Sequence, residues 1–127
     1  METRVQTREV VQASGYAYPL ATTLITATAE GTAHDLGSVR DNSLGYLERL
    51  FVANQTGTTA TLTFYAIPEG GTIGASNKEM TALSIAPNQN ANLAEFTAGL
   101  YAPGTTFKAF SGTASALIVG GYIRGAF

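Results

Sequence analysis

The stretch that decides the fold is TTATLTFYAIP, residues 58–68. In it the bulky side chains Leu62 and Phe64 alternate with Thr63 and Tyr65, and a period of two residues is typical of a β-strand. The pattern predicts a strand with one face packed in a core and a wetter second face that carries mostly hydroxyl groups.

The preceding run, YLERLFVAN at 46–54, alternates in the same way. Leu50 and Val52 are in phase with Tyr46, whereas Arg49 and Phe51 point the other way. Between the two runs the segment NQTGTT supplies the Asn and Gly that reverse a chain. We therefore expect these two runs to form a β-hairpin.

The same pattern extends over most of the chain. Runs of β-branched, aromatic and aliphatic residues, which favour strands, alternate with clusters of Gly, Asn, Pro, Asp or Ser, which favour turns. A length of 127 residues suits one domain, and no helix of ordinary length fits between the runs. The sequence therefore predicts an all-β, single-domain antiparallel β-sandwich of about eight strands, with a jelly roll as the expected topology and an up-and-down barrel as the alternative. The expected strands are residues 20–29, 32–39, 46–54, 58–68, 79–86, 89–97, 105–110 and 114–125.

Residues 1–19 differ from the rest, because charge is concentrated there and the segment closes with Gly, Tyr and Pro. We interpret residues 1–19 as an extended N-terminal arm and residues 20–127 as the sandwich domain; a strand and a frayed terminus both fit the arm. Near the other end, Gly120 and Gly121 interrupt an apolar strand pattern. This combination indicates a bulge or the close approach of another backbone.

Composition restricts the possible partners and compartments. Seven basic and nine acidic residues give a net charge of -2, which offers no phosphate-neutralising surface, so we expect no nucleic-acid partner. Charged residues make up only 13%, against about 25% in typical soluble proteins. The absence of cysteine excludes disulfides and thiolate metal sites. We find no apolar signal segment and no run of about 18 apolar residues, so we expect a soluble protein without a membrane partner.

The search for chemistry yields no catalytic set, and we expect no enzyme activity, no metal and no cofactor. His34 is the single histidine, and its neighbour Asp35 would diverge from it on a strand. Glu79 and Glu95 are interpreted as solvated edge charges rather than as a glycosidase pair. The glycine-rich segment 70–76 lacks the residues of a phosphate-binding loop. Six tyrosines are candidates for stacking sugars: Tyr16, Tyr18, Tyr46, Tyr65, Tyr101 and Tyr122.

Three segments carry a resemblance to a known class of proteins. They are RLFVANQTGTTATLTFYAIPEGG at 49–71, ALSIAPNQNANL at 82–93 and GLYAPGTTFKAFSGTASALIVGGYIRG at 99–125. Their succession resembles small virion proteins of tailed bacteriophages, which are head decoration (cement) proteins or modules of tail fibres and baseplates. The shared elements are turn patterns, so the resemblance transfers no active-site residue.

The resemblance implies a structural protein on the outer surface of the phage head, made in the bacterial cytoplasm. Its partners would be the major capsid protein and copies of itself, with a homotrimer as the expected assembly. Arg4, Arg8, Tyr16 and Tyr18 are the candidate contacts to the capsid or to a neighbouring copy. The alternative is a tail fibre, baseplate or adaptor module that binds a glycan receptor.

Overall fold

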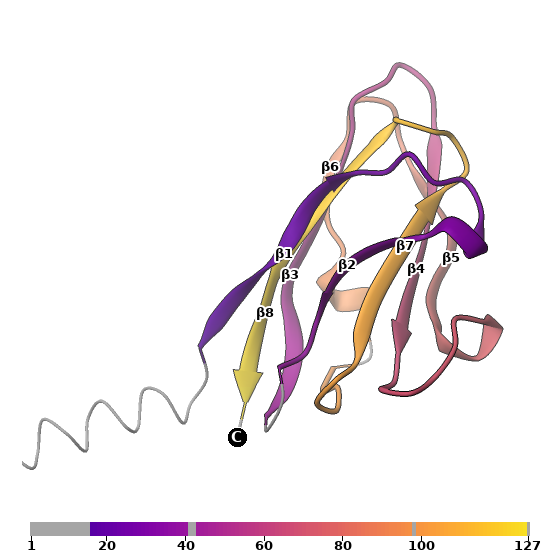
Figure 1. The fold of residues 1–127 in the computed structure, drawn as a ribbon. Coiled ribbons are helices and arrows are strands. Elements are labelled where there is room, and N and C mark those ends of the chain that lie inside the picture. Colours follow the sequence, from indigo (N-terminus) through magenta and orange to yellow (C-terminus); the bar gives the residue numbers. More distant parts are fainter. Residues whose placement is uncertain (1–15, 41–42, 98, 127) are drawn as a thin grey trace, which may run out of the picture.

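A computed structural model describes residues 16–40, 43–97 and 99–126 of the chain, and it shows a sandwich of two antiparallel sheets (Figure 1). One sheet has the strand order β1-β8-β3-β6 and the other the order β2-β7-β4-β5. The strands are β1 (Ala17–Leu24), β2 (His34–Ser38), β3 (Leu44–Asn54), β4 (Ala60–Ile67), β5 (Lys78–Ile85), β6 (Asn90–Asn92), β7 (Thr106–Ser111) and β8 (Leu117–Ala126). Three short 3-10 turns, η1 (Glu30–Thr32), η2 (Ala75–Asn77) and η3 (Ala94–Phe96), lie in the connections.

This topology is the jelly roll that the sequence predicts. In an up-and-down barrel every strand pairs with the next one along the chain, whereas here β4 and β5 are the only consecutive strands that pair among the described residues. Every other connection between consecutive strands crosses from one sheet to the other. The fold class is therefore confirmed, and the barrel alternative is wrong.

The core lies between the two sheets. Phe64 of β4 and Phe107 of β7 stack with ring centroids 5.7 Å apart, and Tyr101 meets Phe107 edge-on at 5.1 Å. From the opposite sheet, Leu50 and Ile123 contribute fully buried side chains. Burial of this apolar surface is the main favourable term in folding and fixes the two sheets face to face.

The expected hairpin between residues 46–54 and 58–68 is wrong, because β3 and β4 belong to different sheets. Asn54, at the end of β3, is only 2% exposed, and its amide Nδ2 donates to the carbonyls of Thr58 and Ile85 at 2.8 and 3.0 Å. Its Oδ1 accepts from the backbone and hydroxyl of Thr56 at 3.0 and 2.7 Å. The segment that looks like a hairpin turn is therefore a crossing between sheets that is held by one buried amide.

The expectation of a wetter second face on β4 is also wrong. Tyr65 is 0% exposed although it lies on the opposite side of β4 from Phe64. Its ring packs beside Phe110 at 6.2 Å, and its hydroxyl donates to Glu30 Oε1 of η1 at 2.8 Å. Because the connection that contains η1 supplies this partner, β4 is buried on both faces.

A bulge in β3 shifts the alternation of its side chains between the two faces of the sheet. Pairing with β8 slips between Leu47 and Arg49, so Leu47 and Leu50 are both buried while Tyr46 is turned away from the core. The expectation that Tyr46 shares a face with Leu50 is therefore wrong. The close approach predicted at the glycine pair is confirmed, because a Cβ on Gly121, whose φ is +143°, would collide with the Arg49 carbonyl.

The first strand begins at Ala17, so Ala17, Tyr18 and Pro19 are part of the sandwich rather than of the arm. Tyr16 directly precedes this strand, and residues 1–15 of the predicted arm lie outside the described residues.

Candidate functional site

The start of β1 and the end of β8 lie at the same end of the sandwich (Figure 1). A row of backbone contacts runs across this end. Tyr16 O accepts from Gly125 N at 2.8 Å, Gly125 pairs with Gly45, and Gly45 bridges to Tyr101. Leu44 and Leu100 flank that bridge and are 41% and 59% exposed. Large apolar side chains are therefore exposed at the end where the polypeptide enters the fold.

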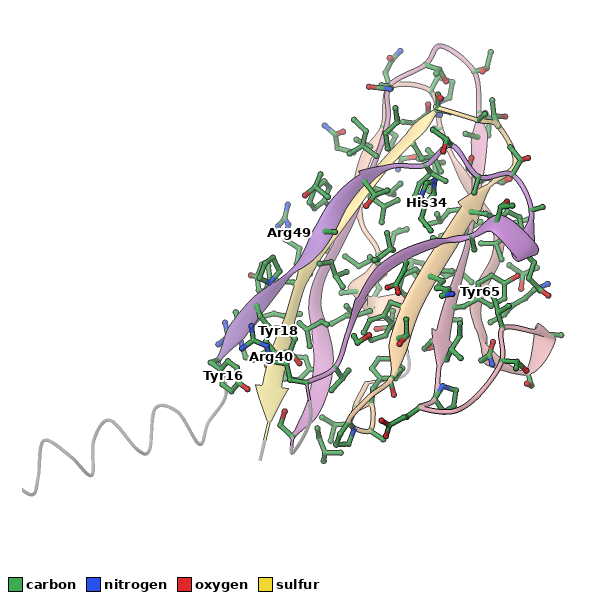
Figure 2. All side chains as sticks on the ribbon, viewed as in Figure 1. Tyr16, Tyr18, His34, Arg40, Arg49 and Tyr65 are labelled. Carbon is green, nitrogen blue, oxygen red and sulfur yellow. The ribbon has the colours of Figure 1, made fainter. Side chains whose placement is uncertain are left out.

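Two of the predicted contact residues, Tyr16 and Tyr18, lie close to Arg40 near this end (Figure 2). Their ring centroids are 5.7 Å apart, and the Arg40 guanidinium carbon lies 4.1 Å from the Tyr18 centroid and 5.5 Å from that of Tyr16. The Tyr18 hydroxyl accepts from the Arg40 backbone N–H at 2.9 Å, and Tyr18 is only 6% exposed. Tyr18 therefore acts as a core residue, whereas Tyr16 is half-buried and Arg40 is exposed.

We call this surface the terminal patch and define it as Tyr16, Arg40, Leu44 and Leu100. The predicted contacts Arg4 and Arg8 lie outside the described residues. No pattern in the sequence indicates Leu44 or Leu100, because it is the bridge between Gly45 and Tyr101 that brings them to one end.

A groove of about 870 Å³ opens beside the connection that follows β4. Its charged side chains are balanced, with Asp35 and Glu69 against Arg40 and Lys108, and no aromatic ring of the described residues lines it. The glycine-rich segment at 70–76 forms part of its wall and continues into η2. Because its charges balance and it has no aromatic lining, this groove has no feature that would select one class of ligand.

A smaller hollow of about 410 Å³ lies on the outer face of the other sheet. Its lining residues are Arg49, Phe51, Ala53, Asn90, Ala91 and Asn92. Figure 2 shows Arg49 on the side of β1 and β8, far from Tyr65 on the side of β7 and β4. We call these six residues the face hollow. They combine one aromatic ring, one guanidinium and two exposed amides.

The single histidine has a structural place. Its Nε2 accepts from the backbone N–H groups of Thr26 and Ala27 at 3.0 and 3.2 Å, which ties the connection after β1 to β2. Asp35 turns away, as expected for neighbours on a strand, and accepts from Gly37 N at 3.1 Å. The two side chains are therefore not brought together.

The two carboxylates considered for catalysis are also separated by the fold. Glu79 belongs to β5 and accepts from the Tyr101 hydroxyl at 2.8 Å. Glu95 belongs to η3, which packs beside β3 of the other sheet. The interpretation of both as non-catalytic groups stays a prediction.

Among the tyrosines considered for sugar stacking, Tyr18, Tyr65 and Tyr101 are buried. Tyr46 and Tyr122 are half-buried and lie on the outer face of the sheet that holds the face hollow. Burial raises the pKa of Tyr65 to about 12, and the hydrogen bond and negative charge of Glu30 add to the effect. This tyrosine is therefore a structural group that stays neutral.

Within the part of the chain that the structure describes, we find no group of three or more metal-ligating side chains. None of its helical segments has the length and apolar character needed to cross a membrane. Comparison of the chain with protein-family models, with curated proteins and with solved structures gave no match.

Proposed function

We propose that this chain is a structural virion protein, a capsid decoration (cement) protein that binds the outer surface of a phage head. The observation that carries the proposal is the terminal patch, where two exposed leucines lie at the same end of the sandwich as Tyr16, the residue that follows residues 1–15. The resemblance of residues 49–125 to phage virion proteins supplies the identity of the partner, the major capsid protein. Copies of the chain itself, as a trimer, are the second expected partner.

The chemistry of the terminal patch suits a flat protein partner. Leu44 and Leu100 are 41% and 59% exposed, and burying the remaining exposed part of each side chain stabilises a complex by about 1 kcal/mol. Arg40 and Tyr16 add an arginine and an aromatic ring, the residue types enriched at interfaces. The low share of charged residues, 13%, fits a protein that is largely surrounded by neighbours.

The N-terminal residues extend the reach of this patch. A segment of 15 residues spans at most about 50 Å when it is fully extended, which is enough to cross a joint between capsid subunits. A segment that becomes ordered on binding covers a large surface, although it contributes less affinity per unit area. Arg4 and Arg8 are the proposed contacts within it.

The mechanism is thermodynamic rather than catalytic. Copies that bind only the assembled shell lower its free energy relative to free capsid subunits, by an amount that grows with their concentration. The bound shell then resists the pressure of packaged DNA. No covalent bond is made or broken.

The deciding experiment is a count of copies per purified virion of the encoding phage, by quantitative mass spectrometry against the major capsid protein. We expect hundreds of copies in a simple ratio to the capsid protein. A few copies to a few tens would refute the decoration role and favour the tail fibre, baseplate or adaptor alternative.

Variants then test the patch itself. Deletion of residues 1–15, and separately Leu100→Ser, should leave the far-ultraviolet circular dichroism unchanged and weaken binding to phage heads that lack this protein. Phe96→Ser is the matched control, because Phe96 is 49% exposed on η3, beside the middle of β3. Full binding by both patch variants would contradict the proposed contact.

A further inference from the structure

The face hollow has the features of a ligand site that is separate from the terminal patch. Its volume of about 410 Å³ falls in the range of roughly 300–1,000 Å³ that is typical of small-molecule sites. We propose that it binds an oligosaccharide that carries carboxylate groups. The proposal does not depend on the decoration role, because it rests on different residues.

The floor of the site is an aromatic ring laid across the sheet. Phe51 of β3 pairs with Gly120 of β8, and a Cβ at Gly120 would lie 2.8 Å from two carbon atoms of the Phe51 ring. The ring therefore covers a position that only glycine leaves open. A pyranose presents C–H groups on its face, and the electron-rich face of an aromatic ring attracts them.

Further aromatic side chains continue this surface. Tyr122 of β8 pairs with Arg49, which lies two residues before Phe51 on β3. Tyr46 lies further along β3 in the same direction and pairs with Arg124. Cross-strand partners share a face of the sheet, so both tyrosines lie on the same outer face as Phe51. Both are half-buried, so each leaves part of its ring open to solvent and to a chain of sugar rings.

The opposite rim supplies amides that can recognise hydroxyl groups. Asn92 Oδ1 accepts from the backbone N–H groups of Leu50 and Ala94 at 3.1 and 3.2 Å, and these two bonds fix the orientation of its amide. The Nδ2 group is then a fixed donor at the hollow. Asn90, which is exposed and pairs with Ala53, supplies a second amide on the same rim.

Charge selects an acidic sugar rather than a neutral one. On this face Arg124 is paired with Glu48, with its guanidinium 2.7 Å from Glu48 Oε1. Arg49 is exposed and has no carboxylate partner among the described residues, and its guanidinium carbon lies 5.9 Å from the Phe51 centroid. An arginine fork binds a carboxylate with two hydrogen bonds, so the uncompensated charge favours an anionic ligand.

The test is isothermal titration of the full chain with short oligogalacturonates, and with neutral xylo-oligosaccharides of the same length. We expect binding of the acidic series only, weakening as salt is raised. Arg49→Gln should lower the affinity at least about tenfold, because hydrogen bonds to charged groups are the stronger ones. Equal affinity for the neutral series would overturn the proposal.

Two further variants separate a binding role from a structural one. Asn92→Asp keeps the oxygen that accepts from Leu50 and Ala94 but places a negative charge at the hollow, so it should abolish binding of the acidic series while the melting temperature changes little. Lys108→Gln, which removes a positive charge from the other sheet, is the matched control and should bind normally. If Lys108→Gln weakens binding as much as Arg49→Gln does, the binding depends on net charge alone, and the face hollow is not the site.

Self-association is the competing explanation of an exposed aromatic face. Analytical ultracentrifugation of the wild-type chain and of Arg49→Gln tests it. If the wild type forms an oligomer that Arg49→Gln dissociates, the face is an interface between copies and the proposal fails. Unchanged association in the variant, together with its weaker sugar binding, supports the site.

Discussion

Replacement of Asn54 by aspartate tests the crossing between the sheets. The substitution preserves shape and the two bonds accepted from Thr56, but it turns the bonds to the Thr58 and Ile85 carbonyls into contacts between oxygens. Asn54 is only 2% exposed, so a carboxylate in its place is removed from water, and one of its oxygens faces two carbonyl oxygens. We expect Asn54→Asp to lower the free energy of unfolding by about 3–5 kcal/mol near pH 7.

The loss of stability in Asn54→Asp should depend on pH. Near pH 4 a larger fraction of the new carboxyl group is protonated and can donate one of the two lost bonds, so the loss of stability should be smaller than near pH 7. Urea unfolding followed by circular dichroism measures both values against the wild type. Asn90→Asp is the control, since Asn90 is exposed and its replacement should stay within about 0.5 kcal/mol. A loss below about 1 kcal/mol near pH 7 in Asn54→Asp would show that Asn54 does not hold the crossing.

Three further predictions concern the fold. Gly121→Ala should lower the free energy of unfolding by about 4 kcal/mol or more in chemical denaturation, because φ is +143° at this position and the new methyl group meets the Arg49 carbonyl. Gly57→Ala is the control and should be nearly neutral, because the space around Gly57 is open. Similar losses in the two variants would contradict this prediction. The Tyr65 pKa of about 12 lies above its ordinary value of 10, so the neutral phenol contributes stability that is complete below pH 10 and is lost as the pH rises through 12. Unfolding at a series of alkaline pH values should therefore show a decline that Tyr65→Phe reduces, and equal declines would contradict this. His34→Ala should cost about 0.5–1.5 kcal/mol by removing the acceptor that the N–H groups of Thr26 and Ala27 share, whereas His34→Gln, which can offer an acceptor, should cost less in the same assay.

The strands were predictable because the turn residues between them are local signals. Pro87 follows the end of β5 at Ile85, and the Pro103-Gly104 turn precedes β7. The partners of each strand were not predictable in the same way. A turn that contains Asn and Gly serves a hairpin and a crossing equally well, and the choice here depends on what Asn54 meets from residues 58 and 85.

The burial of the second face of β4 could not be predicted from the sequence for a related reason. Thr63 and Tyr65 look like residues of a wet face in the local pattern, but Thr63 Oγ1 accepts from Ala82 N and Tyr65 bonds to Glu30. Both partners are distant in sequence, and Ala82 has a φ of +46° that no apolar pattern indicates. Period-two alternation therefore identifies a strand but does not show how many faces the fold will cover.

The face hollow illustrates the same limit. The alternation in residues 46–54 already turns Arg49 and Phe51 away from the core, and the paired glycines already indicate a close approach near β8. What joins them is the register that sets Phe51 against Gly120 and Asn92 against Phe51. Register follows from the whole sheet, so a search for sugar-stacking residues by type alone selected tyrosines and missed this phenylalanine.

The two proposed surfaces are compatible because one strand carries both at different points. Leu44 begins β3 at the terminal patch, and Phe51 follows seven residues later, about 23 Å along the strand. A copy held by its end would leave the face hollow open to solvent. Hundreds of copies on one head would then present many weak sites together, and linked sites can exceed the affinity of one by about 10²–10⁴. Intact heads should therefore bind immobilised acidic polysaccharide far more tightly than the isolated chain does. Heads that carry the Arg49→Gln variant should lose this gain in affinity. If wild-type and variant heads are retained equally, the face hollow does not bind the polysaccharide on the head.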